Sequence, residues 1–258
     1  MRLVRFRPDR NAPVRWGWVR DEMVGPLDGS PFSLFRRDTP TFAIDRVELL
    51  APVEPSKVIC IGRNYAAHAA EHGADVPDLP LIFLKPPSAV IGHRQTIRLP
   101  AQSQQVEHEA ELAVVIGEAG RWIAAEAADR HIFGYTIAND VTARDLQQRD
   151  GQWTRAKGFD TFCPLGPWVE TEFAPADALI TCRVNGQMRQ MASTRDLVFP
   201  VRQLVAFLSS LMSLSPGDVI LTGTPAGVGP LADGDEVEIE IENLGRLSNP
   251  VRAEARPA

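Results

Sequence analysis

The sequence is poor in cysteine, with Cys60, Cys163 and Cys182 as its three thiols among 258 residues. An odd, sparse set without CxxC spacing predicts neither a disulfide framework nor a zinc knuckle, so we expect reduced thiols. No apolar run approaches the roughly 18 residues that a membrane-spanning helix needs, and the first ten residues lack the apolar core of a secretion signal. We therefore expect a cytoplasmic protein without a membrane partner.

Basic residues are also in the minority. The 27 lysines and arginines are outnumbered by 33 acidic residues, which gives a formal net charge of −6. A general nucleic-acid-binding protein would usually carry a basic surface, so we expect no nucleic-acid partner. A small anionic substrate is compatible with this balance, because a few local arginines or lysines can outweigh the net charge.

Strand patterns outnumber helix patterns along the chain. Residues 1–50 contain short strands punctuated by proline and glycine, and residues 51–57 are typical of a linker. Further strands are expected at 58–61, 81–85, 111–116, 134–138, 180–184, 218–222 and 235–241. Helices are expected at 65–72, 122–128 and 200–212. The balance predicts a mainly β fold with some α, divided into a small β segment at 1–55 and a larger domain at 56–258.

Residues 106–117, with the sequence VEHEAELAVVIG, are the most informative stretch. They predict one strand that ends at a glycine. Alternate residues of a strand face the same side, so Glu107, Glu109 and Glu111 would share a face and His108 would point away as a structural residue. Three like charges repel unless a cation lies among them, and carboxylate oxygens suit a hard divalent ion. A solvated strand face is the alternative that this pattern leaves open.

A second candidate lies on the short helix expected at 65–72, with Asn64 as its N-cap. His68 and Glu71 are three residues apart and share a helix face, where the carboxylate would orient the imidazole and raise its basicity. His68 is then a candidate general base. His68 and His72 also fit the inverted zinc-protease motif H-x-x-E-H. That alternative needs a long helix, whereas Gly73 is expected to end this one; a pair of surface polar residues is the other alternative.

Five segments, in their order and spacing, resemble the fumarylacetoacetate hydrolase family. They are IGRNYAAH (61–68), EAELAVVIG (109–117), NDVTARD (139–145), KGFDT (157–161) and LTGTPAGVG (221–229). The resemblance covers about residues 57–258, and the first 50 residues are more loosely similar to the small N-terminal β segment of the family. It implies a β-roll catalytic domain, usually in a homodimer, that acts on oxo acids.

The resemblance also implies roles for individual residues. It selects Glu109, Glu111 and Asp140 as ligands of a buried Mg²⁺ or Mn²⁺, and Ca²⁺ is compatible with the same oxygen donors. The His68–Glu71 pair becomes the base on a lid that orders over the substrate. Lys157 becomes the residue that neutralises developing negative charge.

The remaining residues would bind the substrate, a small anionic oxo acid. Arg144 and Gln147 would meet its carboxylate and oxo end, Thr224 would help to cradle a carboxylate, and Arg63 is a further candidate contact. The larger aromatic residues are expected in the core rather than in the pocket; they are Phe83, Trp153, Phe162 and Trp168.

The base and its carboxylate partner favour hydrolysis, because hydrolysis needs a positioned water and a base. We therefore expect a metal-dependent hydrolase that cleaves a C–C bond in a 2,4-dioxo acid such as an acylpyruvate. Isomerisation of oxo-dienedioates of the 2-hydroxyhepta-2,4-diene-1,7-dioate type and decarboxylation of oxaloacetate stay open. A non-catalytic oxo-acid binder is a remote alternative.

Overall fold

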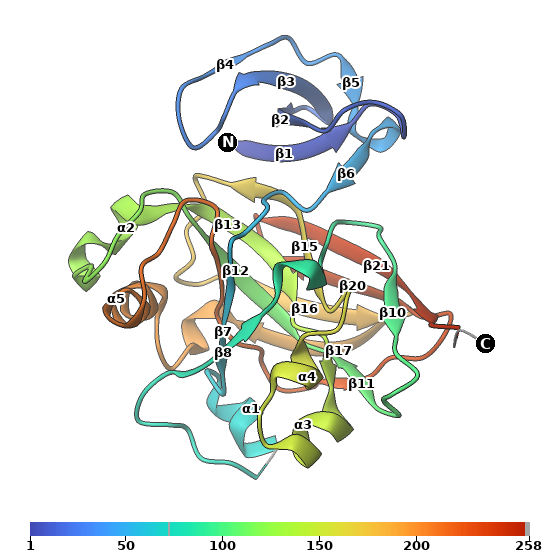
Figure 1. Ribbon diagram of the computed structural model, residues 1–258, viewed down its shortest axis with the longest axis vertical. Helices are drawn as coiled ribbons and strands as arrows, with labels where there is room; N and C mark the ends of the chain where they lie inside the picture. The colour runs from blue at the N-terminus through green and yellow to red at the C-terminus, as the bar shows by residue number, and fades with distance from the viewer. Residues whose placement is uncertain (72, 256–258) are drawn as a thin grey trace.

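Strands dominate the computed structural model, which describes residues 1–71 and 73–255 (Figure 1). The predicted mainly β fold with some α is confirmed. His72, which the zinc-protease alternative needs, lies outside the described residues. None of the helices in the described part of the chain is long and apolar enough to cross a membrane.

The N-terminal residues form a small antiparallel β unit at one end of the molecule (blue in Figure 1). Its strands are β1 (Arg2–Arg7), β2 (Arg15–Arg20), β3 (Met23–Gly29), β4 (Phe35–Arg37), β5 (Phe42–Ala43) and β6 (Glu48–Leu50). Val4, Phe6, Val24 and Leu49 form its own core. Gly17 is required here, because a Cβ on it would lie 2.8 Å from the ring of Phe6.

This unit is continuous with the main sheet, because β1 pairs antiparallel with β15 (Cys163–Glu170). The strand order is β4-β3-β2-β1-β15-β13-β12-β18-β7-β8. Residues 51–57, which the sequence predicts as a linker, connect β6 to the main sheet and are largely buried. Ala51 and Val53 are buried against the core, since apolar side chains in this segment pack on the main sheet.

The central strands of the main sheet are buried on both faces. They are β7 (Val58–Gly62), β12 (Ala110–Ile116), β13 (Ile132–Asn139) and β18 (Val219–Leu221). The strand β8 (Leu81–Lys85) forms the edge of the sheet beside β7, and the short β9 (Val90–Ile91) pairs with β15. Side chains of a strand alternate between faces. Ile59 and Ile61 therefore join one core cluster, and Val58 and Cys60 join another on the opposite face. Burial on both faces explains the nearly continuous apolar runs in the sequence.

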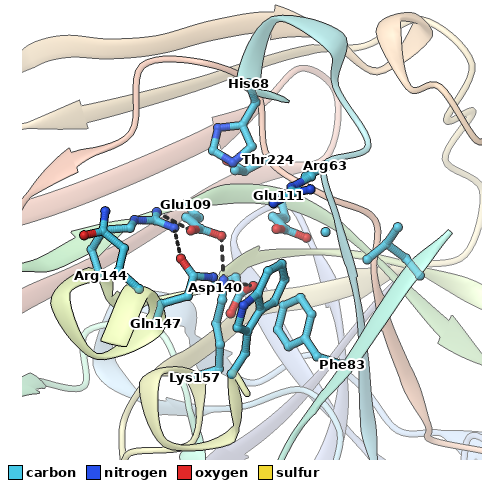
Figure 2. Close-up of a pocket in the computed structure, with 14 residues that line it drawn as sticks. Arg63, His68, Phe83, Glu109, Glu111, Asp140, Arg144, Gln147, Lys157 and Thr224 are labelled. Carbon is cyan, nitrogen blue, oxygen red and sulfur yellow. Dashed lines mark hydrogen bonds and ion pairs between the residues drawn. The ribbon is translucent and has the colours of Figure 1, made fainter. Parts of the chain in front are cut away.

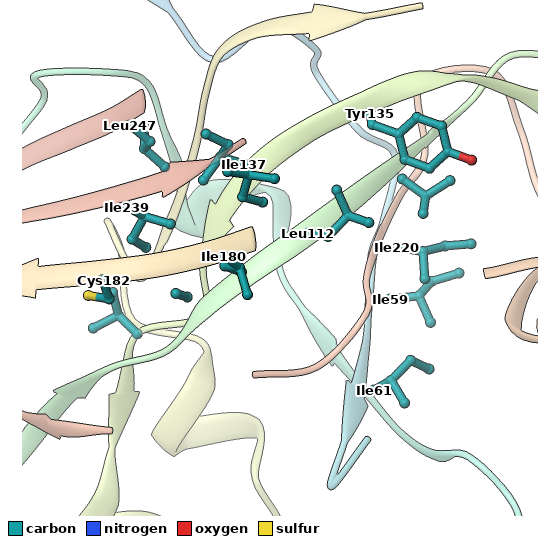
Figure 3. Close-up of a cluster of buried hydrophobic side chains, with 14 of the residues drawn as sticks. Ile59, Ile61, Leu112, Tyr135, Ile137, Ile180, Cys182, Ile220, Ile239 and Leu247 are labelled. Atoms are coloured by element: carbon teal, nitrogen blue, oxygen red, sulfur yellow. The ribbon is translucent and has the colours of Figure 1, made fainter. Parts of the chain in front are cut away.

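A second sheet covers one of these faces, as the stacked side chains in Figure 3 show. Its order is β10 (Ile97–Leu99), β21 (Gly245–Ala253), β20 (Glu236–Ile241), β16 (Leu179–Val184) and β17 (Gln187–Ser193). Ile180 and Ile239 from this sheet pack with Leu112 and Ile137 from the main sheet. A third, small sheet contains β14 (Thr142–Ala143), β11 (Val106–His108) and β19 (Gly229–Pro230).

The helices are short, except for α5. They are α1 (Ala66–Glu71), α2 (Ala128–His131), α3 (Arg144–Asp150), α4 (Thr154–Lys157) and α5 (Val201–Leu211), with 3₁₀ turns η1 (Ile44–Arg46), η2 (Pro87–Ala89), η3 (Ala125–Ala127) and η4 (Thr194–Asp196). The helices expected at 65–72 and 200–212 are confirmed. The one expected at 122–128 is wrong in its first half: Trp122 has a φ of 55°, which no right-handed helix accepts, and the helical residues run from η3 into α2.

Asn64 does not act as the predicted N-cap of α1. Its amide nitrogen donates to the carbonyls of Phe199 and Thr222, and its Oδ1 accepts from the N–H of Phe199. The side chain therefore joins the start of α1 to two distant segments of the chain.

His93 lies in a cavity between the N-terminal unit and the main body, which Leu49 and Trp168 also line. The N–H of Ser248 donates to His93 Nδ1 across 3.1 Å, so this nitrogen must be unprotonated. Burial, reinforced by the charge of Arg94, lowers the pKa of His93 to about 4. The folded protein therefore prefers the neutral imidazole.

We expect His93 to reduce stability in acid. An unfolded histidine takes up its proton near pH 6.5, whereas the folded one stays neutral until about pH 4. Stability is therefore present above about pH 6.5 and is lost as the pH falls through this window. In His93→Asn, which keeps an acceptor but does not titrate, the drop in Tm between about pH 7 and pH 5 should be smaller than in the wild type. An equal drop in both proteins would contradict this assignment.

Candidate functional site

A cavity of about 220 Å³ opens beside the ends of β12 and β13 (Figure 2). Nine of the ten residues that the sequence singled out line it: Arg63, His68, Glu109, Glu111, Asp140, Arg144, Gln147, Lys157 and Thr224. The tenth, Glu71, contacts the pocket residue His68. The structure thus brings together segments that are more than 150 residues apart in the sequence.

Glu109, Glu111 and Asp140 form a buried carboxylate cluster, and each side chain offers an oxygen within 4.8 Å of the others. Each of the three residues is at most 3% exposed. The cluster arises from strand register, because the N–H of Asp140 donates to the carbonyl of Glu109 at the edge of β12 and β13. The run expected to be one strand at 106–117 is in fact interrupted at Glu109, between β11 and β12.

Two buried lysines contact this cluster. Lys157, from α4, donates to Glu109 at 2.8 Å and to Asp140 at 2.6 Å. Lys85, at the end of β8, donates to the other oxygen of Asp140 at 2.5 Å and to the carbonyl of Val141 at 3.0 Å. Sequence reasoning missed Lys85. The signal was a lysine that ends an apolar strand just before two prolines, a position that is equally common at the surface.

Arg144 is more heavily engaged than a substrate-binding arginine was expected to be. Its Nη2 donates to Glu109 at 2.5 Å, its Nε donates to Glu107 at 2.7 Å, and its Nη1 donates to Gln147 Oε1 at 2.6 Å. Glu107 is 5% exposed and serves as a partner of this guanidinium. Arg144 therefore orients Glu109 and Gln147 in addition to presenting positive charge to the pocket.

The pKa values of Glu109 and Glu111 are shifted in opposite directions. Burial works against ionisation of Glu109, but Lys157 and Arg144 outweigh it and hold its pKa well below the usual value. Burial raises the pKa of Glu111, and the charges of Asp140 and Glu109 raise it further. Among the described residues, no side-chain cation forms an ion pair with Glu111, whose Oε2 accepts the N–H of Gly223.

These residues fit a hard divalent cation. The donors are carboxylate oxygens, without the thiolate or imidazole ligands that soft or borderline metals prefer. A buried carboxylate is costly unless a positive charge compensates for it. A divalent ion held by Glu109, Glu111 and Asp140 would supply that charge to Glu111.

The predicted His68–Glu71 pair is present at the other side of the pocket. His68 Nδ1 lies 3.3 Å from Glu71 Oε2, and His68 is 7% exposed. The two oxygens of Glu71 accept the N–H of Gly227 at 3.1 and 3.2 Å. Because α1 has only six residues, it lacks the length that the zinc-protease alternative requires.

Thr224 lines the pocket, but its hydroxyl is already bonded. It donates to the carbonyl of Ala110 at 2.9 Å and accepts from Gln190 Nε2 at 2.8 Å. Thr224 would have to break the bond to Ala110 to donate its hydroxyl proton to a substrate carboxylate, and the expected contact with an anion stays a prediction. The pocket uses the hydroxyl to fix its own wall.

Gln190 on β17 was missed in the sequence and is 1% exposed. Its Oε1 accepts from the N–H of Ala110 and contacts His108 Nδ1, and its Nε2 donates to Thr224 and to the carbonyl of Pro225. Ala110 separates the two glutamates of the cluster. The sequence carried no signal of this role, because Gln190 lies among exposed residues of a strand that belongs to a different sheet.

Two aromatic residues expected in the core line the pocket instead. Phe83 and Trp153 lie 5.2 Å apart between ring centroids, and Lys157 Nζ lies 4.7 Å from the centroid of Phe83. Phe83 reaches the pocket because β8 is at the edge of the main sheet. Phe162 belongs to the core as expected, and Trp168 packs against the N-terminal unit.

Comparison with protein families gives a clear result. The family model described as fumarylacetoacetate (FAA) hydrolase C-terminal matches residues 57–252. The chain belongs to the fumarylacetoacetate hydrolase family. A family model described as Rv2993c-like, N-terminal, matches residues 1–52. The predicted family is therefore confirmed.

Three relatives carry informative names. Mitochondrial oxaloacetate tautomerase FAHD2B of Bos taurus is 48% identical over an alignment of 225 positions that covers 82% of this chain and 72% of that protein. The solved 2-hydroxyhepta-2,4-diene-1,7-dioate isomerase from Mycobacterium marinum is 43% identical, with a TM-score of 0.91 over 99% of this chain and 100% of that one. Maleylpyruvate hydrolase from Sphingobium sp. SYK-6, solved with manganese (II) ion and pyruvate, is 33% identical, with a TM-score of 0.81 over the same shares.

We expect Mg²⁺ or Mn²⁺ to stabilise the folded protein through the carboxylate cluster. At a concentration 100 times its Kd, a ligand that binds only the folded state adds about 2.7 kcal/mol, which is about 5–10 °C in Tm for a chain of this size. Glu111→Gln should lose most of this metal-induced shift in a thermal melt. Asp218→Asn is the matched control: this buried carboxylate bonds with Ser56 and Lys57, so the variant should melt earlier but keep the shift. A full shift in Glu111→Gln would argue against the assigned cluster.

We expect Gln190→Leu to disturb both stability and the site. Buried donors and acceptors of Ala110, Thr224 and Pro225 would lose their partner, at about 1–3 kcal/mol for each group left unsatisfied. Chemical denaturation should show the loss, and metal titration should show a weaker Kd because Ala110 lies between Glu109 and Glu111. Gln187→Leu, an exposed change on the same strand, is the control. An unchanged metal Kd in Gln190→Leu would restrict the residue to a stabilising role.

Proposed function

We propose that the protein is a divalent-metal-dependent enzyme that interconverts the keto and enol forms of a small 2-oxo acid. The observation that carries this proposal is the position of His68, which is paired with Glu71 and lines the same cavity as the carboxylate cluster. The 48% identity to an oxaloacetate tautomerase and the 43% identity to a solved isomerase support proton transfer as the reaction.

The carboxylate cluster would hold the metal, with Mg²⁺ or Mn²⁺ as the best fit to its oxygen donors. Support for manganese comes from the related maleylpyruvate hydrolase, which was solved with that ion. When bound, the ion would polarise the 2-oxo group of the substrate and make the neighbouring C–H bond more acidic.

His68 acts as the base in this proposal. Its Nδ1–H donates to the carboxylate of Glu71, which leaves Nε2 as the proton acceptor on the pocket side. Nε2 takes a proton from the carbon next to the 2-oxo group. The electron pair of that C–H bond forms a C=C bond, and the oxo oxygen takes the negative charge. Return of the proton to this oxygen gives the enol, so no other reactant is consumed.

The cationic residues of the pocket stabilise the anion that forms. Lys157 lies within 2.8 Å of the cluster oxygens and is 2% exposed, so its charge would act with little screening by solvent. Arg144 and Gln147 lie together at one end of the pocket, as Figure 2 shows, and we assign the substrate's carboxylate to that end.

Hydrolysis of a C–C bond in a 2,4-dioxo acid is the second candidate. The same His68–Glu71 pair could take a proton from water instead of carbon, and the relative named as maleylpyruvate hydrolase supports this alternative. Hydroxide would then attack the distal carbonyl, and the C–C bond would break to release a carboxylic acid and pyruvate.

The test is to follow the enol absorbance of oxaloacetate and of an acylpyruvate with the Mg²⁺-loaded protein, and to identify products by NMR. We expect faster keto–enol equilibration of oxaloacetate and a loss of about 10²- to 10⁴-fold in rate for His68→Asn. Glu71→Gln should lose rate as well, and His131→Asn should not. Cleavage of acylpyruvate without tautomerisation of oxaloacetate would favour the hydrolase, and unimpaired rates in His68→Asn would refute the base assignment.

A further inference from the structure

Arg63 lies at the edge of the proposed catalytic pocket. Arg63 is exposed and lines the cavity. Among the described residues, its guanidinium forms no hydrogen bond or ion pair. Figure 2 places it on the other side of the carboxylate cluster from Arg144 and Gln147. At one end of the pocket, the guanidinium of Arg144 is bonded to protein side chains. At the other end, the guanidinium of Arg63 has no such bond among the described residues.

The backbone holds Arg63 in place at a cost. Its φ of 58° lies in the left-handed region, which is uncommon outside glycine and is often found at functional sites. Both neighbours are fixed: Asn64 is bonded to two distant carbonyls, and a Cβ on Gly62 would lie 2.9 Å from the ring of Trp153. The position of Arg63 is therefore set by the surrounding structure and not by a partner of its own side chain.

The rings of Phe83 and Trp153 limit the space beside Arg63. These three residues line both the catalytic cavity and a neighbouring groove of about 910 Å³. The ring pair stands between the two spaces, and Arg63 is at their shared edge. A substrate held at the carboxylate cluster would therefore need only a short chain for its far end to reach the guanidinium.

We propose that Arg63 binds the distal carboxylate of the substrate and thereby selects short oxo-dicarboxylates over oxo-monocarboxylates. The planar fork of a guanidinium matches a carboxylate in two parallel hydrogen bonds. This inference rests on the proposed function in one respect: the 2-oxo acid end is taken to lie at the carboxylate cluster. A dianion would then be held at both ends, by Arg144 with Gln147 and by Arg63.

A matched pair of substrates tests this selection. Oxaloacetate and 2-oxobutanoate share the 2-oxo acid end and the chain length, and differ in whether the fourth carbon is a carboxylate or a methyl group. With Mg²⁺-loaded protein in D₂O, NMR measures exchange of the C3 protons of each. We expect Arg63→Gln to lower the ratio of kcat/KM for oxaloacetate over 2-oxobutanoate by about 10- to 100-fold, mainly through KM.

Two further variants keep the test decisive. Arg63→Gly removes the guanidinium and accepts the left-handed backbone without strain, so it should lose selectivity even if Arg63→Gln folds poorly. Arg94→Gln is the matched control, because Arg94 is another exposed arginine with a φ of 63° that lies outside this pocket. Its ratio should equal that of the wild type. An unchanged ratio in both Arg63 variants would overturn the proposal.

Calorimetric binding of the same two acids separates this inference from the proposed function. If the wild type exchanges neither substrate but binds oxaloacetate more tightly, and Arg63→Gly loses that preference, the proposed reaction fails and the role of Arg63 stands. If exchange occurs and Arg63→Gly keeps the wild-type preference, the reaction stands and the role of Arg63 fails. Equal binding of both acids by the wild type would also overturn the role of Arg63.

Discussion

Burial of three carboxylates within 4.8 Å of one another is the constraint on which the rest of the site depends. Carboxylates in a low-dielectric interior repel each other and lose hydration, so positive charge must be brought in from elsewhere. The chain does so from separate elements: Lys85 ends an edge strand, and Lys157 belongs to the short helix α4. Both lysines contact Asp140, and neither forms an ion pair with Glu111 among the described contacts, which is why the cluster favours an added cation.

One turn of the chain, residues 222–229, connects the parts of the site. The pairing of β18 with β12 ends at Leu221, so the backbone of Ala110 has no strand beside it on that side. Side-chain hydrogen bonds replace the missing strand. The hydroxyl of Thr224 donates to the carbonyl of Ala110, and Gln190 Oε1 accepts the N–H of Ala110. The same turn gives the N–H of Gly223 to Glu111 and the N–H of Gly227 to Glu71. The carboxylate cluster and Glu71 are therefore positioned by a common segment.

The sequence was sufficient to bring together residues whose position follows from local spacing and family order. The spacing of Glu109 and Glu111 and the shared helical face of His68 and Glu71 were read correctly, and nine of the expected residues line one cavity. It was insufficient where contacts are purely tertiary. Gln190 reaches Ala110 from another sheet, and the hydroxyl of Thr224 turns towards the backbone instead of the pocket. The helix expected at 122–128 was wrong in its first half for a local reason. The prediction relied on alanine content, which does not reveal the left-handed backbone of Trp122.

Under the proposed function, the choice between tautomerisation and hydrolysis would depend on what reaches His68, since the proposed base and the carboxylate cluster are the same for both. A water can be activated only if it fits between His68 and the substrate, whereas proton transfer needs the carbon itself near the imidazole. Glu71 is tied to the backbone of Gly227, where only glycine fits, because φ is 97° and a Cβ would lie 2.1 Å from the carbonyl oxygen of Arg189. The proposed base would thus be held from this turn, and the length and charge of the substrate would decide which atom it meets.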